Sequence, residues 1–267
     1  MTPTNQIYLT RAVDFIIAAT SHQLSIDTPP TLAAWHVPAR LWVTLAAPPH
    51  PATGFVVNVT KVDAAFRQTL AQQPVHALNP FQLLTWAAHV VQSRLSPARL
   101  VQLQLMCADQ RQLTLFVEKN TMMQLTSKYE LAASHKLWNP DWDQKQNTDA
   151  FGKCSNPRGH GHNYSVEVTL RSQANPTTGL DIQTGQIDHV VNKLITKRFD
   201  HKNLNEDTTE FAQLLPTVEN MARVFFELLD GQFQNAQLAA VRVWETEKTY
   251  AEYFGDQNQP LRYSNTV

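Results

Sequence analysis

The feature that most constrains the fold of this chain is an internal repeat. Within LWVTLAAPPHPATGFVV and VEVTLRSQANPTTGLDI, the interval from Leu45 to Gly54 equals the interval from Leu170 to Gly179. A second pair of segments, early in each half, is also similar. The repeated pairs are 41–57 with 166–182, and 9–24 with 125–137. We therefore expect the 267 residues to fold as two related domains in tandem.

Both halves predict the same succession: strand, strand, helix, helix, strand, strand. Apolar residues at helical spacing predict the helices 59–70, 80–94, 187–199 and 216–229. Pro80 and Pro216 are expected at helix starts, where a missing N–H has no cost. Alternating residues predict the closing strands 100–107, 114–117, 239–244 and 250–254. The expected class is α+β, with a four-stranded antiparallel sheet in each domain and both helices on one face.

The domain boundary is placed near 118–124, which gives domains 1–120 and 121–267. A four-stranded sheet leaves two open edges, and open edges promote association unless they are paired. Joining several sheets into one closed barrel removes the edges. We therefore expect a homo-oligomer.

Net charge, apolar runs and cysteine content limit the kinds of partner and the compartment that we expect for this protein. A formal net charge of −1 indicates neither nucleic acid nor an anionic membrane as a general partner. No apolar run approaches the roughly 18 residues of a membrane span, and the N-terminus lacks a basic-then-apolar signal pattern. The two cysteines, Cys107 and Cys154, are far apart, as expected of free thiols in a reducing compartment. We expect a cytoplasmic protein.

The stretch richest in reactive side chains is CSNPRGHGHNYSVEVTL, from Cys154 to Leu170. Its second part alternates apolar and polar residues and predicts a half-buried strand. His160 and His162 are two residues apart, so they project on the same side of an extended segment. Two adjacent imidazoles suit a tetrahedral zinc ion that has a third protein ligand. An isolated HxH pair is more often ordinary surface or core histidine, so the case for a metal site depends on the surrounding residues.

His135, in ELAASHKL, is the candidate third ligand, because a hairpin would bring its strand opposite HGH. Three imidazoles with an open fourth position are typical of a catalytic rather than a structural zinc site. The same three nitrogens would also accept nickel or iron. The intervening segment 138–153 is long and polar, and we expect it to be a functional loop.

Six motifs in the second half resemble those of the 6-pyruvoyl-tetrahydropterin synthase family, zinc enzymes of the tunnelling-fold group. They cover about residues 122–255 in family order: AASHKL, GKCSNPRGHGHNY, NPTTGLDI, FDHKNLN, PTVENMA and VRVWETE. The resemblance implies a tunnelling fold in each domain and a Zn²⁺-dependent carbon–oxygen lyase of tetrahydrobiopterin biosynthesis. Its pterin substrate would be 7,8-dihydroneopterin triphosphate, converted to 6-pyruvoyl-tetrahydropterin with loss of triphosphate.

The resemblance also implies a role for each matching residue. The three histidines would hold zinc, and Cys154 would be the catalytic base, with Asp200 and His201 as its acid–base partners. A cysteine needs nearby positive charge to be a thiolate at neutral pH, which zinc and a protonated His201 would supply. Glu245 would grip the guanidine-like edge of the pterin by accepting two parallel N–H bonds. Thr217 would be a lesser ring contact.

Some assignments stay open. The family often has two hydroxyl residues before the Glu-Asn pair of PTVEN, and here the second is Val218, which puts one ring contact in doubt. The sequence does not show which groups bind the triphosphate, and Lys153 and Arg158, which flank the cysteine loop, are no more than candidates. Each assigned role also has a structural alternative: an inert apolar thiol at Cys154, a helix-end charge pair at Asp200–His201, a surface carboxylate at Glu245 and a helix cap at Thr217.

Aligned by the repeat, residues 1–120 lack this chemistry. The zinc positions fall on His22, Trp35 and Val37, the base on Pro29, the acid–base pair on Val75 and His76, and Glu245 on Cys107. We predict a catalytically silent copy that completes the barrel or stacks against the active ring, with Cys107 buried in a strand. In the family the Asp–His pair crosses a subunit boundary. We therefore expect second halves to pack with second halves, in a trimer-like ring.

Three other functions compete with this interpretation. 6-Carboxytetrahydropterin synthase, of the queuosine route, shares substrate and zinc, but it usually has a shorter interval between the cysteine and the HGH histidines than the one from Cys154 to His160. A non-catalytic pterin-binding or scaffold protein is disfavoured because the second half retains the full set of site residues. A zinc hydrolase would need a separate water-activating carboxylate, and the sequence indicates none.

Overall fold

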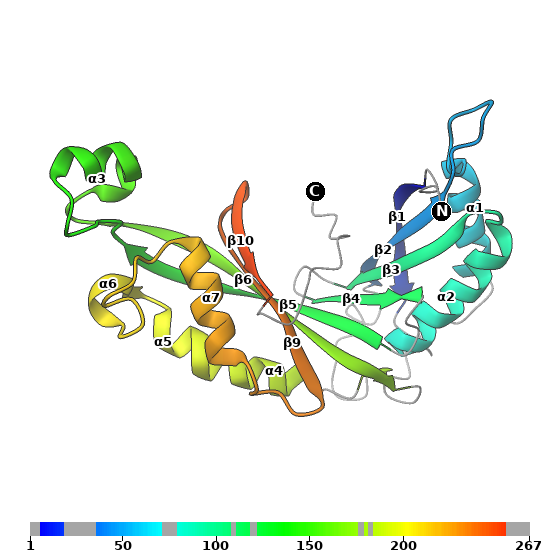
Figure 1. Ribbon diagram of the computed structural model, residues 1–267. Coiled ribbons are helices and arrows are strands. Elements are labelled where there is room, and N and C mark those ends of the chain that lie inside the picture. The colour runs from blue at the N-terminus through cyan, green and yellow to red at the C-terminus, as the bar shows by residue number, and fades with distance from the viewer. Residues whose placement is uncertain are drawn as a thin grey trace, which may run out of the picture. The chain divides into compact units, whose positions relative to one another are not determined.

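A computed structural model of the protein (Figure 1) describes residues 6–18, 36–70, 79–107, 111–117, 122–175, 179–180 and 184–254. The chain divides into two compact units. Unit 1 comprises Met1–Leu125 with Ser172–Asp181, and unit 2 comprises Thr126–Arg171 with Ile182–Val267. Among the described residues, no helix combines the length and apolar character that crossing a bilayer requires.

Unit 1 contains a sheet of four antiparallel strands in the order β1-β2-β3-β4. Its elements are β1 (Ile7–Ala18), β2 (His36–Ala47), α1 (Val59–Leu70), α2 (Pro80–Arg94), β3 (Arg99–Cys107) and β4 (Arg111–Phe116), with the short β7 (Gly179–Leu180) paired to the end of β6. Alternation on β2 buries Leu41, Val43 and Leu45 in one core with α1 and α2. Both predicted helices therefore lie on one face of this sheet.

Unit 2 contains a second sheet, in the order β5-β6-β9-β10. Its strands are β5 (Met122–His135), β6 (His160–Asn175), β8 (Lys202–Asn203), β9 (Ala236–Thr246) and β10 (Thr249–Tyr253). Its helices are α3 (Gln144–Phe151), the 3₁₀ turn η3 (Gly152–Ser155), α4 (Thr184–Val191), the π-helical η4 (Asn192–Thr196), α5 (Lys197–Phe199), α6 (Leu204–Asp207) and α7 (Val218–Leu229). In Figure 1, α4, α5 and α7 lie along one face of the sheet.

The core of unit 2 confirms the predicted alternation on β6. Tyr164, Val166, Val168 and Leu170 are all fully buried, whereas the residues between them are only half-buried. The amphipathic helix α7 covers this face and adds Phe225 to an aromatic cluster with Phe199 and Phe211. This core fixes the position of β6, and therefore of the histidines where it begins.

Three predicted elements differ from the structure. The segment 138–153 is not only a loop, because it contains α3, whose start is fixed by a capping box between Asp143 and Gln146. The helix expected at 187–199 begins earlier and passes through the π-helical η4 before it ends. Pro216 does not begin α7, because Thr217 is the N-cap and the proline precedes it.

One cross-strand contact recurs in the two units at positions that the repeat aligns. In unit 1 the hydroxyls of Thr10 and Thr44 lie 3.0 Å apart on β1 and β2. In unit 2 the hydroxyls of Thr126 and Thr169 lie 2.9 Å apart on β5 and β6. Hydroxyl pairs of this kind stabilise neighbouring strands, and the shared pair supports the alignment of the two halves.

A second recurring contact joins the first helix of each unit to its sheet. Asp63 on α1 accepts two hydrogen bonds of 2.9 Å from Arg11. Asp188 on α4 accepts one of 2.9 Å from the Tyr129 hydroxyl. The two aspartates occupy aligned positions, so the helix is anchored to the strand in a similar way in both units. Of the positions aligned with the site, Val37 lies in β2 and Cys107 ends β3, whereas His22, Pro29, Trp35, Val75 and His76 lie outside the described residues.

Candidate metal centre

Three histidines converge where β5 ends and β6 begins. Their candidate ligand nitrogens, from His135, His160 and His162, all lie within 4.8 Å of one another. The closest pair, Nε2 of His135 and Nε2 of His160, is 3.2 Å apart. β5 and β6 are neighbours in the sheet, so His135 at the end of β5 lies opposite the start of β6. There, strand alternation places His160 and His162 on the same side. The structure therefore brings together the three predicted ligands.

Gly159 allows the two chain segments to approach. Its φ is +68°, and a Cβ built on it would lie 2.7 Å from the carbonyl oxygen of His135. A side chain at this position would therefore need both a strained backbone and a displaced strand end. Gly161 differs, because a Cβ there would lie at an ordinary 3.5 Å from the Ala133 carbonyl oxygen.

The orientation of the His135 ring is fixed by burial and by a hydrogen bond at Nδ1, the ring nitrogen that does not face the other histidines. The ring is 1% exposed, and its Nδ1 lies 2.7 Å from the carbonyl oxygen of Pro216, which can only accept a hydrogen bond. Nδ1 therefore holds the proton and Nε2 presents a lone pair, the usual arrangement of a metal-bound histidine. Burial lowers the pKa of His135, and burial also lowers the pKa of His162. Both rings are thus held neutral, as metal ligation requires.

The residues fit a bound cation. Nε2 of His162 is buried without a hydrogen-bond partner in the described part of the chain. Buried polar atoms left without a partner are rare in folded proteins and need an explanation. In a tetrahedral zinc site, bonds of about 2.0–2.1 Å place ligand atoms about 3.3–3.4 Å apart. The 3.2 Å between His135 and His160 is close to that spacing.

Glu245, on β9, lies against the same cluster. Its Oε1 is 3.4 Å from Nε2 of His162 and 3.7 Å from Nε2 of His135. The side chain is 22% exposed, so it reaches the cluster from the open side. No local sequence pattern places a carboxylate beside the candidate metal ligands, because only the order β6-β9 brings the end of β9 to the start of β6.

Cys154 lies in the 3₁₀ turn η3 at the edge of the cluster. Its backbone is tied to the end of β5, because Leu137 N–H donates to the Cys154 carbonyl at 2.9 Å. Burial raises the pKa of the Cys154 thiol, and the charge of Glu245 raises it further. Without a cation, the thiol is therefore protonated at neutral pH. From the sequence we expect a positive charge that stabilises the Cys154 thiolate, whereas burial and the Glu245 charge both favour the neutral thiol.

Asp200 and His201 are clamped to the outer edge of β5. The Ala132 N–H donates to Asp200 Oδ1 at 2.9 Å, and the His201 N–H donates to the Ala132 carbonyl at 2.6 Å. Their side chains pair across 2.9 Å between Asp200 Oδ2 and His201 Nδ1. Burial raises the pKa of Asp200, but the bonds from Ala132 and His201 outweigh it, and the net pKa is below the ordinary value.

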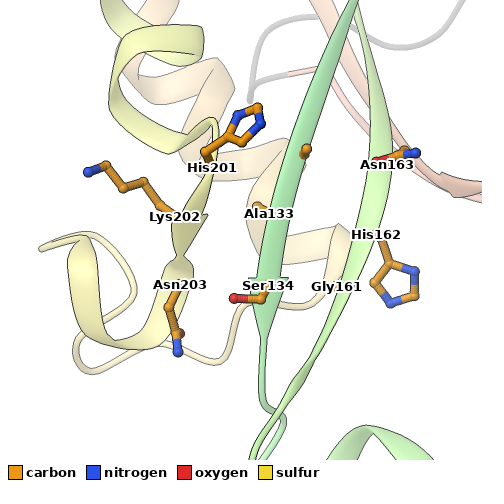
Figure 2. Close-up of a pocket in the computed structure, with 9 residues that line it drawn as sticks. Ala133, Ser134, Gly161, His162, Asn163, His201, Lys202 and Asn203 are labelled. Atoms are coloured by element: carbon orange, nitrogen blue, oxygen red, sulfur yellow. The ribbon is translucent and has the colours of Figure 1, made fainter.

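His201 is presented outward. Its φ is +57°, a conformation uncommon for a residue with a side chain, and its side chain is 82% exposed. It lines a cavity of about 460 Å³ with residues of β5, β6 and β8. In Figure 2, His201 lies beside β5, while the His162 ring projects from β6 on the other side. Among the described residues, no hydrogen bond or ion pair joins Cys154 to Asp200 or His201.

Thr217 has a structural task. Its hydroxyl caps α7 by accepting the Asn220 N–H at 3.3 Å, as the alternative assignment predicted. Val218 is 7% exposed in the core, so an apolar residue suits its position. Lys153 and Arg158 are both exposed on the loop around Cys154.

Asn205 is a positioning residue that the sequence did not single out. Its amide forms two bonds with the backbone of Lys136, directly after His135: Lys136 N–H donates to Oδ1 at 2.7 Å, and Nδ2 donates to the Lys136 carbonyl at 3.0 Å. The contact depends on the parallel pairing of β8 with β5. FDHKNLN contains this asparagine, but nothing local in the motif predicts that pairing.

Comparison with known proteins places unit 2 among pterin synthases. A family described as 6-pyruvoyl tetrahydropterin synthase matches residues 124–256. The Homo sapiens 6-pyruvoyl tetrahydrobiopterin synthase is 34% identical over 133 residues, which are 50% of this chain and 92% of the human protein. The solved structure of the Caenorhabditis elegans 6-pyruvoyl tetrahydropterin synthase has 31% sequence identity and a TM-score of 0.48, covering 51% of this chain and 96% of that one.

A relative with another named product also matches. The 6-carboxy-5,6,7,8-tetrahydropterin synthase of Rickettsia felis is 28% identical over 113 residues, which are 35% of this chain and 80% of that protein. The family match, 124–256, includes the three histidines, Cys154 and Glu245.

Proposed function

Since the chain belongs to the 6-pyruvoyl tetrahydropterin synthase family through residues 124–256, we propose that it is a zinc-dependent lyase. It would convert 7,8-dihydroneopterin triphosphate to 6-pyruvoyl-tetrahydropterin with loss of triphosphate. The observation that supports this most directly is the convergence of three imidazoles beside a carboxylate and a thiol. His135, His160 and His162 would hold the metal, which, when bound, supplies Lewis-acid activation of the substrate side chain.

The residues of the chain divide the remaining work. Glu245 would accept the N–H groups at the guanidine-like edge of the pterin and so orient the ring. Cys154 would remove a proton from the side-chain carbon, once a bound cation offsets the burial and the carboxylate charge that keep the thiol protonated. His201, oriented by Asp200, would exchange protons with the substrate oxygens. Thr217 remains a candidate for a lesser ring contact beside its capping role.

We infer that the acid–base pair acts on the site of another subunit in a homo-oligomer. The side chain of His201 is 82% exposed, and in the part of the chain that the structure describes no hydrogen bond joins it to Cys154. The test is to mix two inactive variants, Cys154→Ala and His201→Ala, under conditions that allow subunit exchange. Restored turnover in the mixture is expected, because some sites would then combine an intact thiol with an intact imidazole. A mixture as inactive as its parts would contradict shared sites.

The product identifies the reaction. The zinc-loaded protein is incubated with 7,8-dihydroneopterin triphosphate, and the pterin product is identified by mass. 6-Pyruvoyl-tetrahydropterin is expected. 6-Carboxytetrahydropterin would instead establish the alternative function, which the similarity to the Rickettsia felis protein keeps open. An unchanged substrate, with zinc bound, would favour a non-catalytic pterin-binding protein.

We further propose that residues 1–120 are a catalytically silent copy of the domain at 121–267. The shared element order and the recurring Thr10–Thr44 and Thr126–Thr169 contacts support a common origin. Two of the three zinc positions are replaced in the aligned sequence. The full chain should therefore bind one zinc ion per molecule, measured by elemental analysis after dialysis, and a ratio of two would refute the proposal.

A further inference from the structure

The polar contacts of Glu245 are all with the metal-site histidines. Within the part of the chain that the structure describes, its carboxylate approaches Nε2 of His162 at 3.4 Å and Nε2 of His135 at 3.7 Å, and no other side chain or backbone group pairs with it. A carboxylate serving only to bind a pterin would have no reason to lie against these two nitrogens when no pterin is present.

The atoms that face one another here are three imidazole nitrogens and one carboxylate oxygen, all of types that bind metal ions. Nδ1–H of His135 is donated to Pro216, so its Nε2 presents a lone pair. Nε2 of His162 is buried and has no hydrogen-bond partner. Both nitrogens lie within 3.7 Å of one carboxylate oxygen, and Nε2 of His160 lies 3.2 Å from Nε2 of His135. A cation placed among these atoms would offset the charge of the carboxylate and accept the nitrogen lone pairs.

We propose that Glu245 is the fourth protein ligand of the cation in the substrate-free protein, and that it exchanges the metal for the pterin ring when substrate binds. The measured separations of 3.2, 3.4 and 3.7 Å approach the edges of about 3.3–3.4 Å expected of a tetrahedral site. The carboxylate lies beside His135 and His162, within reach of an ion held by the three imidazoles. Only the exchange with pterin rests on the proposed function.

Direct measurement of zinc affinity tests the ligand. The dissociation constant is obtained by competition with a chromophoric chelator for the wild type, Glu245→Gln and the matched control Glu247→Gln, an exposed glutamate two residues further on. Loss of a ligand should weaken zinc binding at least tenfold in Glu245→Gln, since even outer-shell partners are worth 10–100-fold. The control should stay within twofold of the wild type.

Cobalt substitution tests the exchange. The electronic spectrum of the Co²⁺-loaded wild type should differ from that of Co²⁺-loaded Glu245→Gln. Adding 7,8-dihydroneopterin should shift the wild-type spectrum and leave that of the variant nearly unchanged. Glu245→Asp, which keeps a shorter carboxylate, should bind zinc more tightly than Glu245→Gln, and this comparison remains decisive if the glutamine variant folds poorly.

The outcomes separate the two proposals. Zinc affinity within twofold of the wild type in both Glu245 variants, with an unchanged cobalt spectrum, would overturn the ligand role and leave the lyase proposal intact. A tenfold loss of affinity in a protein that fails to convert the pterin triphosphate would keep the ligand role and refute the lyase.

Discussion

His135 Nδ1 lies 2.7 Å from the carbonyl oxygen of Pro216, the residue that precedes the N-cap of α7. The orientation of a candidate metal ligand on β5 is therefore set by a turn 81 residues further along the chain. The bond also selects the tautomer, since the carbonyl can only accept. The helix that covers the core of unit 2 and the metal site thus share one hydrogen bond.

The approach of β6 to His135 leads to a prediction for two neighbouring glycines. Gly159→Ala should destabilise the protein by about 1–3 kcal/mol, because it combines a strained φ of +68° with a Cβ 2.7 Å from the His135 carbonyl oxygen. Gly161→Ala, with its nearest contact at 3.5 Å, should change the free energy of unfolding by less than about 0.5 kcal/mol. Urea unfolding of the two variants measures both. Equal effects would show that the close approach at Gly159 is not a constraint.

The thiol of Cys154 should react slowly in the metal-free protein. Burial and the Glu245 carboxylate raise its pKa, so the thiolate fraction at pH 7.5 should be smaller than that of a free cysteine, whose pKa is about 8.5. Alkylation by iodoacetamide, followed on the Cys154 peptide by mass spectrometry, should increase with pH to a midpoint above that value. Glu245→Gln should move the midpoint down. A midpoint below 8 in the metal-free wild type would contradict the prediction.

The clamp at Asp200 should contribute to stability in a pH-dependent way. The folded-state pKa of Asp200 is below its ordinary value of about 3.9. The ionised carboxylate therefore stabilises the fold above that value, and this contribution is lost as the pH falls through the lower folded pKa. Asp200→Asn, which keeps an oxygen for the Ala132 N–H, should be less stable than the wild type at pH 6, by up to about 1 kcal/mol for a partly exposed pair. Denaturant titrations should show the gap closing towards pH 3, whereas a gap that widens on acidification would refute the assignment.

Asn147 should stabilise the segment between β5 and β6, the two strands that carry the candidate metal ligands. It is fully buried, accepts the Asn139 N–H at 2.7 Å, and donates to the carbonyls of Asn139, Trp142 and Asp143. Asn147→Ala would remove these hydrogen bonds of a buried side chain and should cost about 1–3 kcal/mol. Limited proteolysis should cut the variant within 138–153 faster than the wild type. Lys145→Ala, on the exposed side of the same helix, serves as the control and should be cut no faster.

Local pattern predicted much of unit 2. The period of two on β6 placed four residues in the core and two histidines on one side, and the hairpin argument brought His135 to them, because strand alternation is a local property. The helix α3 was missed, although the Asp143–Gln146 capping box was available in the sequence. Its polar composition favoured a loop, and the short helix has little apolar surface to reveal it.

The residues that sequence could not place depend on pairing between distant segments. Asn205 reaches Lys136 only because β8 pairs in parallel with β5. Glu245 reaches His162 only because β9 lies beside β6. Neither of these strand arrangements produces a periodic pattern in the sequence of the strands concerned. Asp200 likewise accepts a hydrogen bond from the Ala132 N–H, a contact between distant segments that no motif predicts.

The hydrogen bond from Leu137 N–H to the Cys154 carbonyl, 2.9 Å long, ties together the two ends of the excursion 138–153. The segment 138–153 is therefore closed at its base by this hydrogen bond, and it contains the capped helix α3. Changes of length or composition within the segment need not move β5 and β6. A reporter peptide, or a substitute sequence from a homologue, could be grafted there while the histidines keep their register.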